Sequence, residues 1–131
     1  MNQAWQAATQ QGELEQVRYL LESGADINVR DRYGQTALMN AARTGQVELV
    51  RLLVEQGAAL NTTAKYHLTA LMLAIINGHT EIAHLLIRAG TDGSLRGSGA
   101  PGFSGKTALI LAEERGQAEV VAWLKAAGVQ G

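Results

Sequence analysis

The sequence predicts an all-α solenoid of stacked helix-turn-helix units, and three observations lead to that prediction. One text segment recurs four times, as GELEQVRYLLESG, GQVELVRLLVEQG, GHTEIAHLLIRAG and GQAEVVAWLKAAG. Apolar residues within it keep helical spacing. Units this short cannot bury an apolar face alone, so neighbours are expected to stack and share a core. Two glycine series repeat every 33 residues with a last step of 38: Gly12, Gly45, Gly78 and Gly116, and Gly24, Gly57, Gly90 and Gly128.

Each unit is expected to begin with a short first helix. Its segments are TALMNAART, TALMLAIIN and TALILAEER, which start at Thr36, Thr69 and Thr107, and a degenerate QAWQAATQQ stands at the N-terminus. Threonine is a good N-cap, because its hydroxyl accepts a bond from an orphan backbone N–H, and Ala, Leu and Met favour helix. The pattern predicts helices of about eight residues, roughly 12 Å long. The first glycine series then ends them in left-handed conformation.

The second segment of each unit predicts a helix that is packed on more than one side. In the second unit Val47, Val50, Leu53 and Val54 recur at helical spacing, and further leucines flank them. Such a wide apolar face is typical of a buried helix. The second glycine series marks where these helices end.

These residues resemble the ankyrin-repeat family, whose 33-residue unit combines a turn, two helices and a T-P-L-H-x-A signature. The resemblance covers nearly the whole chain and implies a protein-interaction fold, an all-α ankyrin-repeat solenoid with short β-turn or hairpin fingers. Two departures are systematic, since alanine stands at the proline of the signature and Met or Ile at its histidine. His67 also replaces the glycine of the turn, where positive φ is expected. The resemblance is carried by Asp31, Gly34, Thr36, Leu38, Ala41, Ala42, Gly45, Glu48, Leu52, Leu53, Gly57 and Asn61, and the departures are Ala37, Ala70, Ala108, Met39, Met72 and Ile110.

The whole chain, residues 1–131, is interpreted as one repeat domain. Residues 1–31 form a cap that lacks its first turn, 32–64 and 65–104 are internal repeats, and 105–131 form the terminal repeat. The third repeat is longer than the period, and its excess lies in residues 91–105. This segment is rich in Gly and Ser and holds the only proline, Pro101. We expect it to be a mobile, protruding loop.

Composition narrows the class of protein. Eleven Lys and Arg against twelve Asp and Glu leave a net charge of −1, so bulk charge favours neither nucleic acid nor cation binding. The chain has no cysteine, which excludes disulfides, thiolate metal sites and thiol catalysis. No basic leader or long apolar run is present. The sequence therefore predicts a soluble, cytoplasmic protein without membrane or nucleic-acid partners.

Side chains that suggest chemistry elsewhere have plainer explanations here. His79 and His84 are five residues apart, which does not suit a metal site on one helix face, so no metal or cofactor is expected. No serine elbow or HExxH pattern occurs, and no enzymatic activity is predicted. Trp5 and Trp123 align with leucines of other repeats, and they are interpreted as core residues.

The segment APGFSGKT, residues 100–107, matches a relaxed phosphate-loop pattern, in which Lys106 and Thr107 would bind phosphate and magnesium. A phosphate loop follows a β-strand, however, whereas the segment before residues 100–107 is predicted to be a helix. Thr107 is also in register with Thr36 and Thr69. Weak anion or nucleotide binding at this glycine-rich loop remains an alternative function.

The favoured function is a non-enzymatic docking surface for a partner protein or an acidic peptide segment. Solenoids bind through an extended concave surface, and the resemblance implies that it comprises the turn tips and the exposed side of the first helices. Tyr, Phe and Arg are enriched among residues that dominate interface energies. The mapped surface includes Gln35, Thr44, Leu68, Ile76, Asn77, Ser104 and Glu114 around the expected partner-binding residues Arg32, Tyr33, Arg43, Lys65, Tyr66, Phe103, Lys106 and Arg115.

A further alternative concerns the C-terminal end. The last helical segment, QAEVVAWLKAAG, carries few charges for a surface that closes a stack, because capping repeats need a polar outer face. It therefore suggests a homo-oligomerising scaffold. The chain is expected to be a monomer or a weak homodimer.

Overall fold

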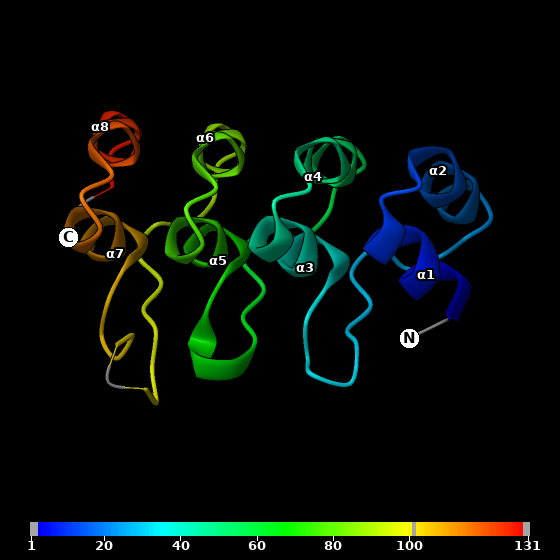
Figure 1. The fold of residues 1–131 in the computed structure, drawn as a ribbon, viewed down its shortest axis with the longest axis horizontal. Coiled ribbons are helices and arrows are strands. Elements are labelled where there is room, and N and C mark those ends of the chain that lie inside the picture. Colours follow the sequence, from blue (N-terminus) through cyan, green and yellow to red (C-terminus); the bar gives the residue numbers. More distant parts are fainter. Residues whose placement is uncertain (1–2, 101, 130–131) are drawn as a thin grey trace.

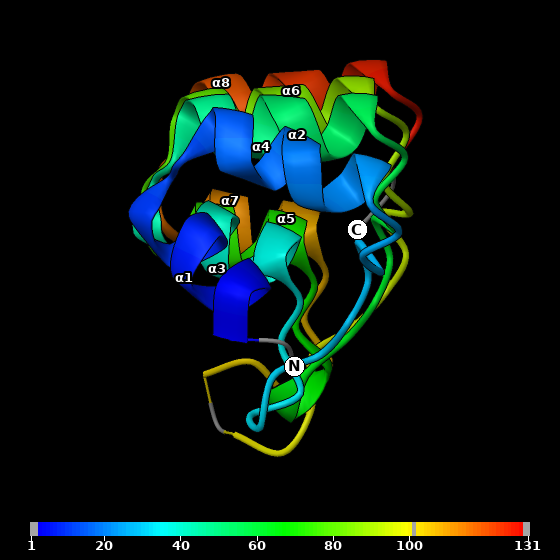
Figure 2. The ribbon, with the colours of Figure 1, turned by 90° about the vertical axis from the view of Figure 1, so that its right-hand side faces the viewer.

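The computed structural model describes residues 3–100 and 102–129, which form eight α-helices arranged as four antiparallel pairs in a row (Figure 1). The helices lie in two layers, with the first helix of every pair in one layer and the second helix in the other (Figure 2). This all-helical stack confirms the predicted fold. The first helices are α1 (Gln3–Gln11), α3 (Ala37–Thr44), α5 (Ala70–Ile76) and α7 (Ala108–Glu114), and the second are α2 (Leu14–Glu22), α4 (Val47–Glu55), α6 (Thr80–Arg88) and α8 (Ala118–Ala126).

Threonine caps start three of the first helices, as predicted. The hydroxyl of Thr36 accepts a hydrogen bond from the backbone N–H of Met39 at 3.2 Å, and Thr69 and Thr107 make the equivalent bonds at 3.2 and 3.3 Å. At the other end of α3, Gly45 has a φ of +84°, a left-handed conformation that favours glycine. The second helices carry a glutamate in their first turn, near the positive end of the helix dipole.

The apolar core runs through the stack between the two layers. Helix α5 lies between α3 and α7, and six of its seven residues are buried. Met39 and Met72 are each 1% exposed and belong to the apolar core. Trp5 is equally buried, whereas Trp123 is only partly buried and stacks on His84 with ring centroids 4.1 Å apart. Trp123 is thus an edge residue of the core rather than a central one.

Polar side chains link each repeat to the next. The Asn28 amide oxygen accepts the backbone N–H of Ala59 at 2.8 Å, and Asn61 accepts that of Asp92 at the same distance. In the helical layers, a ring nitrogen of His79 lies 3.0 Å from the carbonyl oxygen of Arg43. Since each repeat bonds to its sequence neighbours, coupling along the stack runs from one repeat to the next.

The turns that lead into the first helices end in tips, at Arg32 and Tyr33 in the second repeat and at Lys65–His67 in the third. These turn tips project from the layer of first helices (Figure 1). In the third repeat the tip is a 3₁₀ turn, η1 (Lys65–His67), in which His67 has a φ of +55°, as expected for a residue at the glycine position. Tyr66 beside it also has positive φ, +62°, which the sequence did not indicate. Two adjacent non-glycine residues in this region are strained and need support from their surroundings.

That support comes from the long loop of the third repeat, which protrudes as predicted but is also anchored. The backbone N–H of Ser98 donates to the carbonyl of Tyr66 at 2.7 Å, and the Ser98 hydroxyl lies 2.7 Å from Nδ1 of His67. A bridge between Gly97 and Ser104 ties the two limbs of the loop together. The sequence predicted a mobile, protruding loop and did not indicate these contacts. Pro101 lies outside the described residues.

Candidate docking groove

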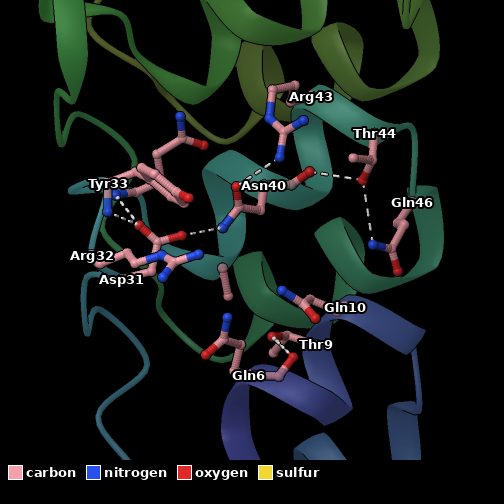
Figure 3. A pocket seen from close by; sticks show the side chains of 12 residues that line it. Gln6, Thr9, Gln10, Asp31, Arg32, Tyr33, Asn40, Arg43, Thr44 and Gln46 are labelled. Atoms are coloured by element: carbon pink, nitrogen blue, oxygen red, sulfur yellow. Dashed lines mark hydrogen bonds between the residues drawn. The ribbon is translucent and has the colours of Figure 1, made fainter. Parts of the chain in front are cut away.

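An open groove of about 1030 Å³ lies between α1, α3 and the turn tip of the second repeat (Figure 3). The first-helix layer supplies both walls, and the tip supplies one end. Polar side chains make up nearly all of the lining, and three of them carry charge. The lining residues are Gln6, Thr9, Gln10, Asp31, Arg32, Tyr33, Gln35, Ala37, Asn40, Arg43, Thr44 and Gln46.

A chain of hydrogen bonds runs from Asp31 at the tip along the α3 wall of the groove to Arg43. Asp31 Oδ1 accepts the backbone N–H groups of Tyr33 and Gln35 at 2.9 and 3.0 Å, an Asx-turn arrangement that shapes the tip. Its Oδ2 accepts Nδ2 of Asn40 at 3.2 Å, and Asn40 Oδ1 accepts Nη2 of Arg43 at 3.1 Å. Burial raises the pKa of Asp31, but these hydrogen bonds and the nearby Arg43 charge outweigh it, so the pKa lies below its usual value.

Asp31→Asn is expected to flatten the acid limb of the pH–stability profile. Because the Asp31 pKa is lowered on folding, its carboxylate stabilises the fold fully above its unfolded pKa, near 3.8, and this stabilisation disappears as pH falls through the folded pKa. The variant should lose about 1 kcal/mol of unfolding free energy at neutral pH and show a smaller drop in acid. Urea unfolding of both proteins across this pH range measures the difference. Parallel profiles would contradict the assignment.

Arg32 and Tyr33 form the most exposed part of the tip. The Arg32 guanidinium carbon lies 5.0 Å from the Tyr33 ring centroid, within cation–π range, and 66% of Tyr33 is exposed. Contact with the ring restricts the guanidinium, and both residues remain exposed. This pair therefore presents a large, partly ordered contact surface next to the groove.

The corresponding aromatic residues of the later repeats are less exposed and contact one another. Lys65 Nζ lies 5.0 Å from the Tyr66 ring centroid, but Tyr66 and Phe103 are half-buried and contact one another with ring centroids 6.0 Å apart. Leu68, mapped to the exposed face by sequence, is only 6% exposed, so that placement was wrong. Its side chain belongs to the core that supports the first-helix layer.

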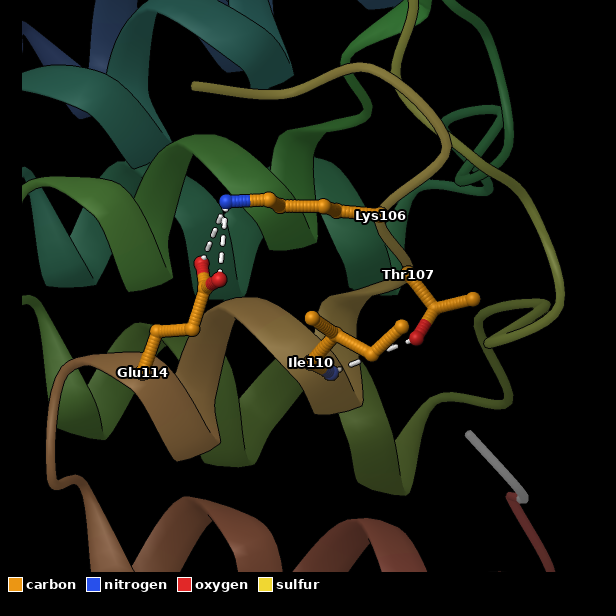
Figure 4. Close-up of polar contacts among 4 residues, drawn as sticks. All are labelled: Lys106, Thr107, Ile110 and Glu114. Carbon is orange, nitrogen blue, oxygen red and sulfur yellow. Dashed lines mark hydrogen bonds and ion pairs between the residues drawn. The ribbon is translucent and has the colours of Figure 1, made fainter. Parts of the chain in front are cut away.

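Lys106 and Thr107, the residues of the phosphate-loop alternative, have partners within the repeat (Figure 4). The two Glu114 oxygens lie 2.8 and 2.9 Å from Lys106 Nζ, and the Thr107 hydroxyl caps α7 by accepting the N–H of Ile110. The chain enters this segment from a loop after helix α6, not from a strand. Arg115 is exposed at the end of α7. Of the five expected binding residues in the last two repeats, Tyr66 thus contacts Lys65 and Phe103, whereas Lys106 is paired with Glu114 and Arg115 lies at the end of α7.

Neither a metal cluster nor a membrane-spanning helix is found in the described part of the chain. Within residues 3–100 and 102–129, no three His, Cys, Asp or Glu side chains are grouped as a metal site would require. None of the helices described here has the length and apolar character needed to cross a bilayer.

Comparison with known families agrees with the geometry. A family model for ankyrin repeats, in three copies, matches residues 4–97 and 69–130. The chain belongs to the ankyrin-repeat family. No curated protein matches its sequence closely enough to count as a relative. Ankyrin repeats are in general protein–protein interaction modules, and the groove lies on the first-helix and finger side that solenoids offer to partners.

Sequence reasoning found Arg32, Tyr33 and Arg43 of this groove but missed Asn40 and the wall formed by α1. The first repeat lacks a turn of its own, so its first helix was interpreted only as a cap. The polar face of that helix, with Gln6 and Gln10, is nevertheless visible in QAWQAATQQ. The four-residue spacing of these two glutamines places them on one face of a helix, and this was the signal from which the wall could have been predicted.

Proposed function

We propose that this ankyrin-repeat chain is a non-enzymatic docking module that binds an acidic segment of a partner protein through its finger and first-helix face. The observation that carries the proposal is the exposed Arg32–Tyr33 pair beside an open, preformed groove. Tyr and Arg give large contact area and directed hydrogen bonds at modest entropic cost. Because the groove is already formed, ordering entropy falls mainly on the partner.

The distribution of charge supports an acidic partner. On the finger side Arg32, Arg43, Lys65 and Arg115 lie outside ion-pair distance of any carboxylate among the described residues, while Lys106 is neutralised by Glu114. Glutamates are concentrated instead on the second helices, on the other layer. A chain of net charge −1 therefore offers a locally basic face, and such complementarity mainly increases association rate and specificity.

Exchange of Arg32 and Tyr33 for alanine is expected to weaken binding at least tenfold with little change in melting temperature. Dodecapeptides selected from a random phage-displayed library on the wild-type protein serve as ligands, and fluorescence anisotropy measures their dissociation constants. The matched control is Arg18→Ala/Tyr19→Ala on α2, where Tyr19 is 61% exposed on the second-helix layer. Loss of a hot-spot pair justifies the magnitude.

The two double variants separate the outcomes clearly. The proposal requires that the control keep wild-type affinity while the tip variant loses it. Equal effects of both variants, or no effect of the tip variant, would place the docking surface elsewhere. Failure to select any peptide on the wild-type protein would count against a peptide-docking function altogether.

A further inference from the structure

The acidic and the basic side chains of the groove differ in how far their hydrogen-bonding groups are occupied. The carboxylate of Asp31 is occupied by three donors of its own chain, the N–H groups of Tyr33 and Gln35 and the amide of Asn40. Arg43 instead gives one hydrogen bond to a neutral amide oxygen, out of the five N–H groups that a guanidinium carries. In the described part of the chain neither Arg32 nor Arg43 forms an ion pair. The Asp31 carboxylate is therefore already hydrogen-bonded, whereas the guanidinium groups of Arg32 and Arg43 keep N–H groups that can donate to a ligand.

Asn40 fixes the position of one of these cations. Its Nδ2 donates to Asp31 and its Oδ1 accepts from Arg43, so the amide can take only one orientation in this chain of bonds. Figure 3 shows Asn40 between the turn tip and Arg43 on the wall formed by α3. Because a free arginine side chain loses substantial rotamer entropy when it binds, an arginine held in advance loses less.

The opposite wall has a different chemistry. Gln6 and Gln10 of α1 line it, and neutral amides both donate and accept hydrogen bonds (Figure 3). Such groups match the alternating N–H and C=O of an extended main chain, whereas a guanidinium matches a carboxylate in a bidentate pair. Charge on one wall and amides on the other suit a peptide whose backbone lies along α1 and whose acidic side chains point toward α3.

We infer that this groove between the first two repeats receives an extended acidic segment, whose carboxylates are bound by Arg43 and Arg32, and that Asn40 is the positioning residue for Arg43. The inference rests on the proposed docking function and narrows it to one end of the stack. Lys106 and Arg115, at the other end, are not part of this site. A volume of about 1030 Å³ and an open shape accommodate several residues of such a segment.

The probe is a blocked hexaglutamate peptide, and hexaglutamine is its uncharged control, each titrated into the full chain labelled with nitrogen-15. Hexaglutamate is expected to shift the amide signals of residues 31–44 and the side-chain Nε–H signals of Arg32 and Arg43, and to bind less tightly in higher salt. Hexaglutamine should bind at least tenfold more weakly. Signals from α6 and α8 should not move.

Variants test the individual roles. Arg43→Ala should raise the dissociation constant for hexaglutamate about tenfold, and Asn40→Ala about three- to fivefold. Gln16→Ala on α2 and Arg88→Ala at the end of α6 change exposed residues of the second-helix layer, so they are matched controls that should stay within about twofold. Arg115→Ala, at the other end of the finger side, tests the placement of the site. Nitrogen-15 relaxation of Arg43 Nε should show greater mobility in Asn40→Ala, a change that a merely structural asparagine would not produce.

The outcomes also separate this inference from the docking function. If Arg115→Ala weakens hexaglutamate binding as much as Arg43→Ala, or if shifts appear at the last two repeats, the placement of the site is wrong. If library peptides bind through Arg32 and Tyr33 but hexaglutamate does not shift the groove, the acidic segment is wrong and the docking function stands. Unchanged affinity and Arg43 mobility in Asn40→Ala would overturn the positioning role.

Discussion

Gly45→Ala is expected to destabilise the protein by about 2 to 3 kcal/mol, whereas Gly57→Ala should cost about 1 kcal/mol. Both glycines end helices with nearly equal φ, +84° and +86°, so the conformational penalty of a side chain is the same. They differ in their surroundings. A Cβ at Gly45 would lie 2.8 Å from Cε1 of His79, whereas nothing lies within 4 Å of one at Gly57.

The extra cost arises because His79 is not free to move without loss. Its ring bonds to the carbonyl of Arg43 at 3.0 Å, which joins the start of α6 to the end of α3. An alanine at position 45 pushes the ring away and breaks this link between repeats. Urea unfolding followed by circular dichroism gives the free energies.

A double-mutant cycle isolates the steric contribution. In a His79→Ala background the ring is absent, so Gly45→Ala and Gly57→Ala should become equally costly. If the difference between the two glycines persists without His79, the close approach is not its cause.

Local signals made the helices and their ends predictable. The capping bond of Thr36 spans three residues, and the left-handed Gly45 follows directly from where α3 must stop, so both could be inferred without knowledge of the packing. The 33-residue period then placed the repeats side by side. Family membership and the interaction class followed from the same pattern.

Contacts between distant residues were not predictable in the same way. The positive φ of Tyr66 depends on Ser98 and the long loop, more than 30 residues later, and no sequence rule reports such support. The ion pair of Lys106 with Glu114 crosses from the loop to the last residue of α7. Both contacts change which residues a partner can reach, so the sequence listed candidate cations and aromatics without separating the available ones from those already engaged.

In the groove, too, local features could be predicted from the sequence and contacts between distant residues could not. Its tip could be anticipated, because Asp31 followed by Gly34 is a turn signature and Tyr33 lies between them. Its volume could not, because a groove exists only once α1 packs beside α3. The role proposed for Asn40 likewise depends on bonds that reach nine residues back and three residues ahead.

The second large effect is expected from Trp5→Ala, which should cost about 3 to 5 kcal/mol of local stability in the first repeat. Trp5 is 1% exposed and fills the core beneath α1, so removal of its ring leaves a cavity. Its indole N–H is buried without a hydrogen-bond partner among the described residues. Trp5→Phe is the matched control: it keeps most of the volume and removes the unpaired N–H, so it should cost far less.

The loss in Trp5→Ala should be confined to one end of the stack. Within the described chain α1 packs mainly on α2 and α3, and a terminal repeat is coupled to a single neighbour. Hydrogen exchange measured by mass spectrometry should therefore show lost protection in α1 and α2, with α5 and α6 unchanged. Equal loss of protection in all four repeats would show that the stack unfolds as one cooperative unit.

Binding should respond more strongly than overall helicity, because α1 forms one wall of the groove. When α1 detaches, Gln6 and Gln10 leave the site while Arg43 and Asn40 remain on α3, so the hexaglutamate peptide should keep its contacts to charge and lose those to its main chain. Trp5→Ala is thus expected to raise the dissociation constants of hexaglutamate and hexaglutamine by similar factors. Arg43→Ala removes only charge recognition, so it should raise the dissociation constant of hexaglutamate much more than that of hexaglutamine. If Trp5→Ala detaches α1 and both peptides still bind as they do to the wild-type protein, α1 is not a wall of the site.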